Sequence, residues 1–139
     1  IKYESQEFAQ ALPYFEKALK NLPKFYSAIL HLGASQHQQK DYLKAAHTFQ
    51  KATALRPKDA IAQRYMGMSL LMAQAYPQSE TSFKNALKLG DRSPSTYYQL
   101  SIAQDRQGKK TEAQSNLNRV LSMDESLSGK ALQKLSEMN

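Results

Sequence analysis

The sequence repeats itself with a period of about 34 residues, and this period restricts the possible folds more than any other feature. Phe15, Phe49, Phe83 and Leu117 are equally spaced at this interval. Small or medium-sized residues recur at the same interval on either side of these large ones. They are Ala11, Ala45, Ser79 and Ala113 on one side, and Ala18, Ala52, Ala86 and Val120 on the other. Offsets of three and four residues place side chains on one face of a helix, so the pattern predicts four similar helices.

A different apolar helix is predicted between successive copies of the repeated one. Residues 25–39 and 61–74 have helical periodicity, and the pair Leu32–Gly33 recurs one period later as Met66–Gly67. A glycine inside a helix costs about 1 kcal/mol relative to alanine, so we expect each glycine to admit a neighbouring helix at close range.

Turn-forming residues separate the predicted helices. Pro23 and Pro57 are expected to end the helices before them, and the side chain of Asp41 to cap the helix that follows it. Gly90 is expected to end another helix, and no segment has the alternating pattern of a strand. The last segment, 128–139, is predicted to form a closing helix over the core of the final unit. Its buried side is expected to comprise Ala131, Leu132, Leu135 and Met138.

The repeating unit resembles the tetratricopeptide repeat (TPR), a helix-turn-helix unit of about 34 residues. In residues 26–59 the family pattern falls on Leu32, Gly33, Tyr42, Ala45, Phe49, Ala52 and Pro57. Residues 60–93 and 94–127 match less completely, with Ser79 in place of an alanine and Lys110 in place of the aromatic residue. The resemblance implies an all-α solenoid over residues 1–139, a right-handed superhelix of helical hairpins. Residues 1–25 would be a partial unit, and residues 128–139 the closing helix.

Composition and charge exclude several classes of protein. The chain has no cysteine, which removes disulfide bridges and thiolate sites, and it has no apolar run long enough to cross a membrane. Its 19 basic and 12 acidic residues give a net charge of +7, which attracts nucleic acid, anionic membrane surfaces or acidic proteins. Most basic residues fall opposite the apolar stripe, where an ordinary exposed surface is expected. Composition leaves a cytoplasmic or a periplasmic location open, and the start at Ile1 inside a repeat predicts further residues upstream.

No constellation of residues indicates an enzyme, a metal site or a cofactor. The three histidines are His31, His37 and His47. On a helix, His31 and His37 would be about 240° apart, off a common face. No nucleophile and base stand at catalytic spacing, and no glycine-rich phosphate loop is present.

In proteins of the TPR family, the first helices of successive units line a concave surface that binds peptide segments. Transferring this register gives a set of inward-facing residues, most of them apolar and not needed for helix packing. The set is Leu30, Ala34, His37, Ile61, Arg64, Met68, Leu71, Met72, Tyr98, Ile102, Asp105 and Arg106. Some family members hold a partner's C-terminal carboxylate with Lys, Asn and Arg at such positions. The residues here do not reproduce that clamp, so we expect an apolar groove, or burial of these side chains under the next repeat.

These observations favour a non-catalytic scaffold that binds a partner peptide or amphipathic segment in the groove. One alternative is self-assembly into a homo-oligomer, in which a bare solenoid end of one chain continues the stack of another. A further alternative is nucleic-acid binding through the basic outer surface. The apolar character of the inward positions disfavours base recognition.

Overall fold

The computed structural model describes residues 22–123 and 125–138, which form seven helices and no strand. These helices are α3 (Leu22–Gln38), α4 (Tyr42–Leu55), α5 (Ala60–Met72), α6 (Tyr76–Lys88), α7 (Pro94–Arg106), α8 (Lys110–Met123) and α9 (Glu125–Met138). The all-α prediction is confirmed. The residues predicted to form the first, partial unit before Leu22 lie outside the described part of the chain.

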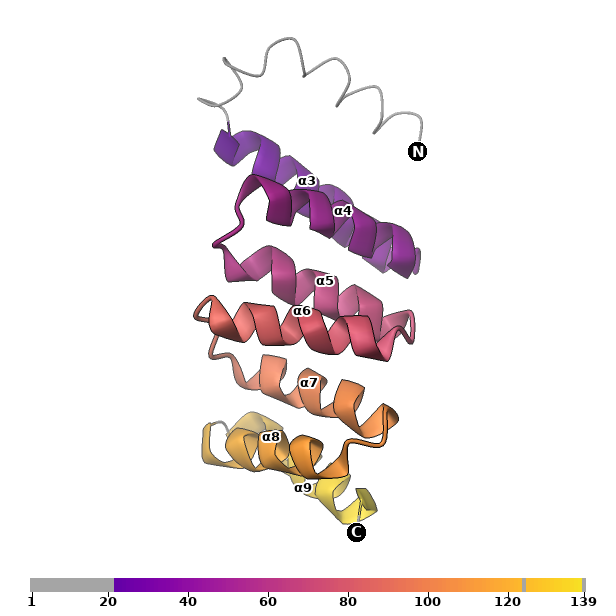
Figure 1. Ribbon diagram of the computed structural model, residues 1–139, viewed down its shortest axis with the longest axis vertical. Coiled ribbons are helices and arrows are strands. Elements are labelled where there is room, and N and C mark those ends of the chain that lie inside the picture. The colour runs from indigo at the N-terminus through magenta and orange to yellow at the C-terminus, as the bar shows by residue number, and fades with distance from the viewer. Residues whose placement is uncertain (1–21, 124, 139) are drawn as a thin grey trace.

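Short turns join the helices, and each helix packs on the next one in sequence. The first helices of successive pairs also contact one another, α3 with α5, α5 with α7, and α7 with α9. Figure 1 shows the result, a stack that runs along the long axis from α3 at one end to α9 at the other. We call the exposed side of α3, α5 and α7 the inner face, and that of α4, α6 and α8 the outer face.

The repeated large and small residues form the interior of the stack. Phe49 is 2% exposed, and Phe83 and Leu117 are fully buried. Each predicted glycine contact is present, since a Cβ atom placed on Gly33 would lie 2.5 Å from the ring of Phe49, and one on Gly67 would lie 2.9 Å from the ring of Phe83. The repeat period therefore reflects one packing arrangement, in which a phenylalanine lies against the backbone of the preceding helix.

Two details of the turns differ from the sequence prediction. Pro23 lies in the first turn of α3, which begins at Leu22 and not at residue 25 as predicted, while the helix that Pro23 was expected to end lies outside the described residues. The missing N–H of Pro23 costs nothing there, because the first turn has no intrahelical acceptor for it. Asp41 does occupy the N-cap position of α4, but its side chain makes no capping hydrogen bond. The turn is held instead by the backbone, where the Asp41 N–H donates to the Gln36 carbonyl at 2.9 Å.

The closing helix α9 begins at Glu125, slightly earlier than predicted. Ala131 is fully buried and Met138 is 8% exposed, so these two side chains cover the final core as expected. Leu132 was predicted to join them, but it is 57% exposed. Leu132 is exposed because it lies one period after Tyr98, so the repeat register places it with the predicted inner-face residues and not on the buried side of α9. Within the described ranges, no helix has both the length and the apolar character needed to cross a membrane.

Candidate functional site

A pocket of about 350 Å³ opens on the inner face between α3 and α5. Successive turns of α3 form one wall, and Met68 of α5 forms part of the other. The rings of Phe49 and Tyr65 complete the lining, with centroids 5.5 Å apart and planes tilted by 52°. The full set of lining residues is Ser27, Leu30, His31, Ala34, His37, Gln38, Phe49, Tyr65 and Met68. The walls are therefore largely apolar, with polar side chains from α3 at the edge.

His37 is held in place at the edge of this pocket. Its Nδ1 lies 2.9 Å from the hydroxyl of the buried Ser69, and its ring meets Tyr42 edge-on with centroids 5.0 Å apart. His31 also lines the pocket, although the sequence placed it off the face of His37. The two predictions are compatible, because the pocket extends across the whole inward side of α3 and side chains at opposite edges of that side both reach it.

Ile61 and Arg64 line a different, wider pocket of about 820 Å³ beside the turns before α5 and α7. Ile61 is 42% exposed. Arg64 places Nε 3.8 Å from a carboxylate oxygen of Asp91. Burial alone would raise the pKa of Asp91, but hydrogen bonds from Ser93 and Thr96, together with Arg64, hold that pKa below its ordinary value. Asp91 is therefore ionised at neutral pH and fixes the guanidinium at this end of the inner face.

The predicted inner-face residues of α7 are partly engaged by the end of the stack. Tyr98 packs against the C-terminal core cluster, and Asp105 forms an ion pair with Lys134 of α9 at 3.2 Å. Ile102 is half-buried. Arg106 is exposed, with its guanidinium carbon 6.0 Å from the centroid of the Tyr76 ring.

The structure thus brings four of the predicted residues into one pocket, namely Leu30, Ala34, His37 and Met68. It places Leu71 half-buried and Met72 53% exposed farther along α5. The sequence prediction did not include Ser27, His31, Gln38, Phe49 and Tyr65. A signal for two of them was present, because Ser27 and Gln38 lie one period before Ile61 and Met72. In the described part of the chain, no three His, Asp or Glu side chains converge as metal ligands would.

Comparison with known proteins identifies the same repeat that the helical hairpins show. One model of the tetratricopeptide repeat matches residues 1–60 and 38–95, and another matches residues 94–127. The chain belongs to the tetratricopeptide repeat family. A curated relative is the general transcriptional corepressor trfA of Dictyostelium discoideum, which is 26% identical over 117 residues. That alignment covers 83% of this TPR chain but 8% of the corepressor, so the chain corresponds to a small part of that protein.

Solved TPR structures share the fold at low sequence identity. The type III secretion chaperone SycD of Yersinia enterocolitica, in complex with a peptide of the translocator YopD, has a TM-score of 0.77 and 17% identity. The match covers 83% of this chain and 92% of SycD. The second TPR domain of human RPAP3, in complex with an HSP70 peptide, has a TM-score of 0.74 and 19% identity, over 84% of this chain and 97% of that domain.

Proposed function

We propose that this TPR chain is a non-catalytic interaction module that binds a peptide segment of a partner protein on its inner face. The pocket between α3 and α5 is the anchor of this interface. The observation that carries the proposal is the convergence of Leu30, Ala34, His37 and Met68 around one cavity, as the repeat register predicts. Two proteins of the same fold, SycD and RPAP3, are known in complex with peptides, which supports the same use of the fold here.

The lining of the pocket indicates what kind of side chain it receives. Leu30, Met68 and the rings of Phe49 and Tyr65 offer an apolar surface, and a cavity of about 350 Å³ suits one or two large apolar side chains. The thioether of Met68 adapts to ligands of different shape. Ser27 and Gln38 at the edge can hydrogen-bond to the peptide backbone. Apolar anchoring is therefore the proposed mode of binding, in place of a clamp for a terminal carboxylate.

The proposal can be tested with peptides selected from a random display library against the intact chain. Met68→Glu places a charge in the pocket, and we expect it to weaken the selected peptides by more than about tenfold, which corresponds to about 1.4 kcal/mol. Leu71→Glu tests the neighbouring part of the inner face in the same way. Met123→Glu is the matched control, because Met123 is 43% exposed at the end of α8, away from the inner face. Peptides that bind Met68→Glu and the parent chain equally well would contradict the proposal.

A further inference from the structure

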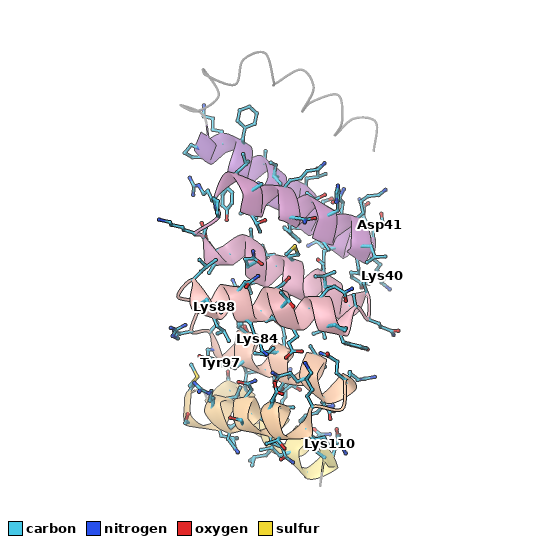
Figure 2. The ribbon with its side chains drawn as sticks, in the orientation of Figure 1. Lys40, Asp41, Lys84, Lys88, Tyr97 and Lys110 are labelled. Atoms are coloured by element: carbon cyan, nitrogen blue, oxygen red, sulfur yellow. The ribbon has the colours of Figure 1, made fainter. Side chains whose placement is uncertain are left out.

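The wide pocket of about 820 Å³ beside the turns before α5 and α7 contains charged groups that apolar anchoring does not use. We call it the turn pocket, and the pocket between α3 and α5 the inner pocket. Both turns lie on one side of the stack. Figure 2 shows Lys88 on that side, and Lys40 and Lys110 on the other. The charged residues that line the turn pocket are Arg56, Lys58, Asp59, Arg64 and Asp91. Three cations and two carboxylates leave the lining with an excess of one positive charge.

The two carboxylates of the turn pocket already accept hydrogen bonds from uncharged donors. Asp59 is the N-cap of α5 and accepts from the N–H of Ile61 at 3.0 Å. Asp91 accepts from the N–H and the hydroxyl of Ser93 at 2.8 and 2.6 Å, and from the hydroxyl of Thr96 at 2.7 Å. Both carboxylates therefore serve to hold the turns at which α5 and α7 begin.

The guanidinium group of Arg64 is held in place, but within the described part of the chain it donates no hydrogen bond. Its Nε lies 3.8 Å from a carboxylate oxygen of Asp91, which is close enough for charge attraction and too long for a hydrogen bond. Its Cζ lies 5.2 Å from the centroid of the Tyr65 ring. The five N–H donors of this planar group thus remain available to a ligand that presents paired oxygens.

The two other cations of the turn pocket are equally uncommitted among the described residues. Arg56 places Nη1 3.9 Å from Asp59 and Cζ 4.6 Å from the centroid of the Tyr26 ring. Lys58 is exposed in the turn before α5. The side chains of Arg56 and Arg64 are only 37% and 27% exposed, so water screens their charge less than it would on an open surface.

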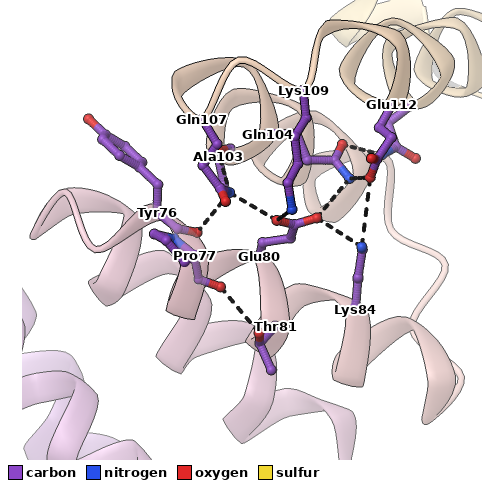
Figure 3. A network of polar contacts seen from close by, with 11 residues as sticks. Tyr76, Pro77, Glu80, Thr81, Lys84, Ala103, Gln104, Gln107, Lys109 and Glu112 are labelled. Atoms are coloured by element: carbon purple, nitrogen blue, oxygen red, sulfur yellow. Dashed lines mark hydrogen bonds and ion pairs between the residues drawn. The ribbon is translucent and has the colours of Figure 1, made fainter.

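Other cations of the neighbouring repeat are already bonded. Arg92, in the turn before α7, donates to two backbone carbonyls at 2.6 and 2.7 Å. Figure 3 shows the network around Glu80 in the space between α6 and α8, where Lys84 and Lys109 each place Nζ 2.8 Å from the Glu80 carboxylate. Unused donors therefore distinguish the turn pocket from these two places.

The turn pocket adjoins the inner pocket along α5. Arg64 of the turn pocket and Met68 of the inner pocket are one helical turn apart, a rise of about 6 Å, and Ile61 and Met68 are about 10 Å apart in rise. Tyr65 lines the inner pocket and lies beside Arg64. An extended peptide rises about 3.3 Å per residue, so side chains two or three positions apart on one bound peptide would reach both pockets.

We propose that the turn pocket binds an acidic side chain of the same peptide, an Asp or Glu two or three positions from the apolar residue that enters the inner pocket. This inference rests on the proposed function and specifies its partner, a segment with one apolar anchor and one carboxylate. The carboxylate accepts hydrogen bonds from the guanidinium fork of Arg64, and Arg56 and Lys58 add positive charge.

The charge of the turn pocket favours a carboxylate over a phosphate. One carboxylate balances the excess of one positive charge, whereas the nearly two negative charges of a phosphate would be repelled by Asp59 and Asp91. The arrangement also differs from a clamp for a terminal carboxylate. Arg56 and Lys58 belong to the turn between α4 and α5, outside the inward-facing register of the first helices.

Peptides selected from a random display library against the intact chain test the inference. We expect them to carry Asp or Glu two or three positions from the apolar anchor. One selected peptide and a twin with Gln in place of the acid are then titrated against the parent chain and against Arg64→Gln. Both peptides carry a C-terminal amide, so that only the side-chain carboxylate is compared.

The Gln twin should bind the parent chain more weakly than the acidic peptide by about threefold or more. On Arg64→Gln this difference should shrink to less than about twofold, as expected for two groups that contact each other. Arg56→Gln, in the exposed turn, should also narrow it, and this variant decides the matter if Arg64→Gln loses its helical circular dichroism. Arg119→Gln is the matched control, because Arg119 is exposed on α8 and lies 5.5 Å from the centroid of the Tyr97 ring, outside the pocket.

The outcomes separate this inference from the proposed function. Selected peptides without an acid at this spacing, or an acidic peptide and a Gln twin that bind the parent chain equally, would overturn the inference. An undiminished difference on both arginine variants would also overturn it. If the same peptides still lose binding to Met68→Glu, the proposed function stands without the acidic contact. Peptides that bind Met68→Glu and the parent chain equally would overturn the proposed function and this inference together.

Discussion

Replacing Gly33 by alanine tests whether the glycine–phenylalanine contact determines how closely the helices pack. The added Cβ atom would lie 2.5, 2.7 and 2.8 Å from three ring carbons of Phe49. Carbon atoms in favourable contact are about 3.5–4.0 Å apart, so the ring has to move by about 1 Å. Phe49 is 2% exposed, but its ring lines the inner pocket, so part of this displacement can be taken up on that side.

The magnitude follows from two opposing contributions. Overpacking a core costs about 1–3 kcal/mol of the free energy of unfolding. Alanine recovers about 1 kcal/mol, because glycine is the poorer helix former. We therefore expect Gly33→Ala to destabilise the chain by up to about 2 kcal/mol, as the difference between these contributions. Gly67→Ala should cost less, since its nearest ring carbons lie at 2.9 Å.

Gly129 in α9 provides an internal control, because a Cβ atom there would meet nothing within 4 Å. Gly129→Ala should stabilise the chain by about 0.5–1 kcal/mol. The helix-propensity gain is similar in both variants, so the difference between Gly33→Ala and Gly129→Ala measures the steric cost alone. Equilibrium unfolding in urea, followed by circular dichroism, gives both free energies of unfolding. The two values can be compared directly when the two variants have the same m-value.

Two results would refute this reasoning. One is a Gly33→Ala chain stabilised as much as Gly129→Ala. The other is a double mutant, Gly33→Ala with Phe49→Leu, that shows no coupling energy, since a smaller side chain at position 49 should relieve the clash.

The other predictions concern the same core and the buried carboxylate. Phe49→Ala should lower the free energy of unfolding by about 3–5 kcal/mol through the cavity it leaves. Ala52→Leu should lower it by about 1–3 kcal/mol, because Ala52 is fully buried and the larger side chain overpacks the core. Unchanged thermal melts would contradict both predictions. Burial alone would raise the pKa of Glu80, but hydrogen bonds from Lys109, Lys84, Gln107 and Gln104 lower it from 4.5 to about 2. Its stabilising contribution is therefore complete above pH 4.5 and is lost as the pH falls toward 2, so acid titration of stability should be shallower in Glu80→Gln than in the parent chain.

The helical architecture could be predicted from the sequence because it depends on local spacing and on side-chain volume. The contact between Gly33 and Phe49 is indicated by the joint recurrence of both residues one period later, as Gly67 and Phe83. Helix ends were less accurate, as the start of α3 shows, because Pro23 is compatible with both the end of one helix and the first turn of the next.

The candidate inner site was only partly predictable. The repeat register identifies which residues face inward, but it does not show which of them remain free. Tyr98 and Asp105 were predicted to line the inner face, but the structure engages them with the C-terminal core and with Lys134 of α9. His31 reaches the pocket because of the pocket's width, which depends on the spacing of α3 and α5.

Sequence alone was enough to predict the repeating unit, its helices and the packing of one hairpin, since all of these follow from side chains close together along the chain. The contacts between side chains of neighbouring hairpins became visible only in the folded chain. Ala46 and Glu80 occupy the same register, and nothing local shows that one borders an open groove and the other fills a gap. That outcome depends on whether side chains from three different helices are long enough, and suitably charged, to meet across the space that stacking creates.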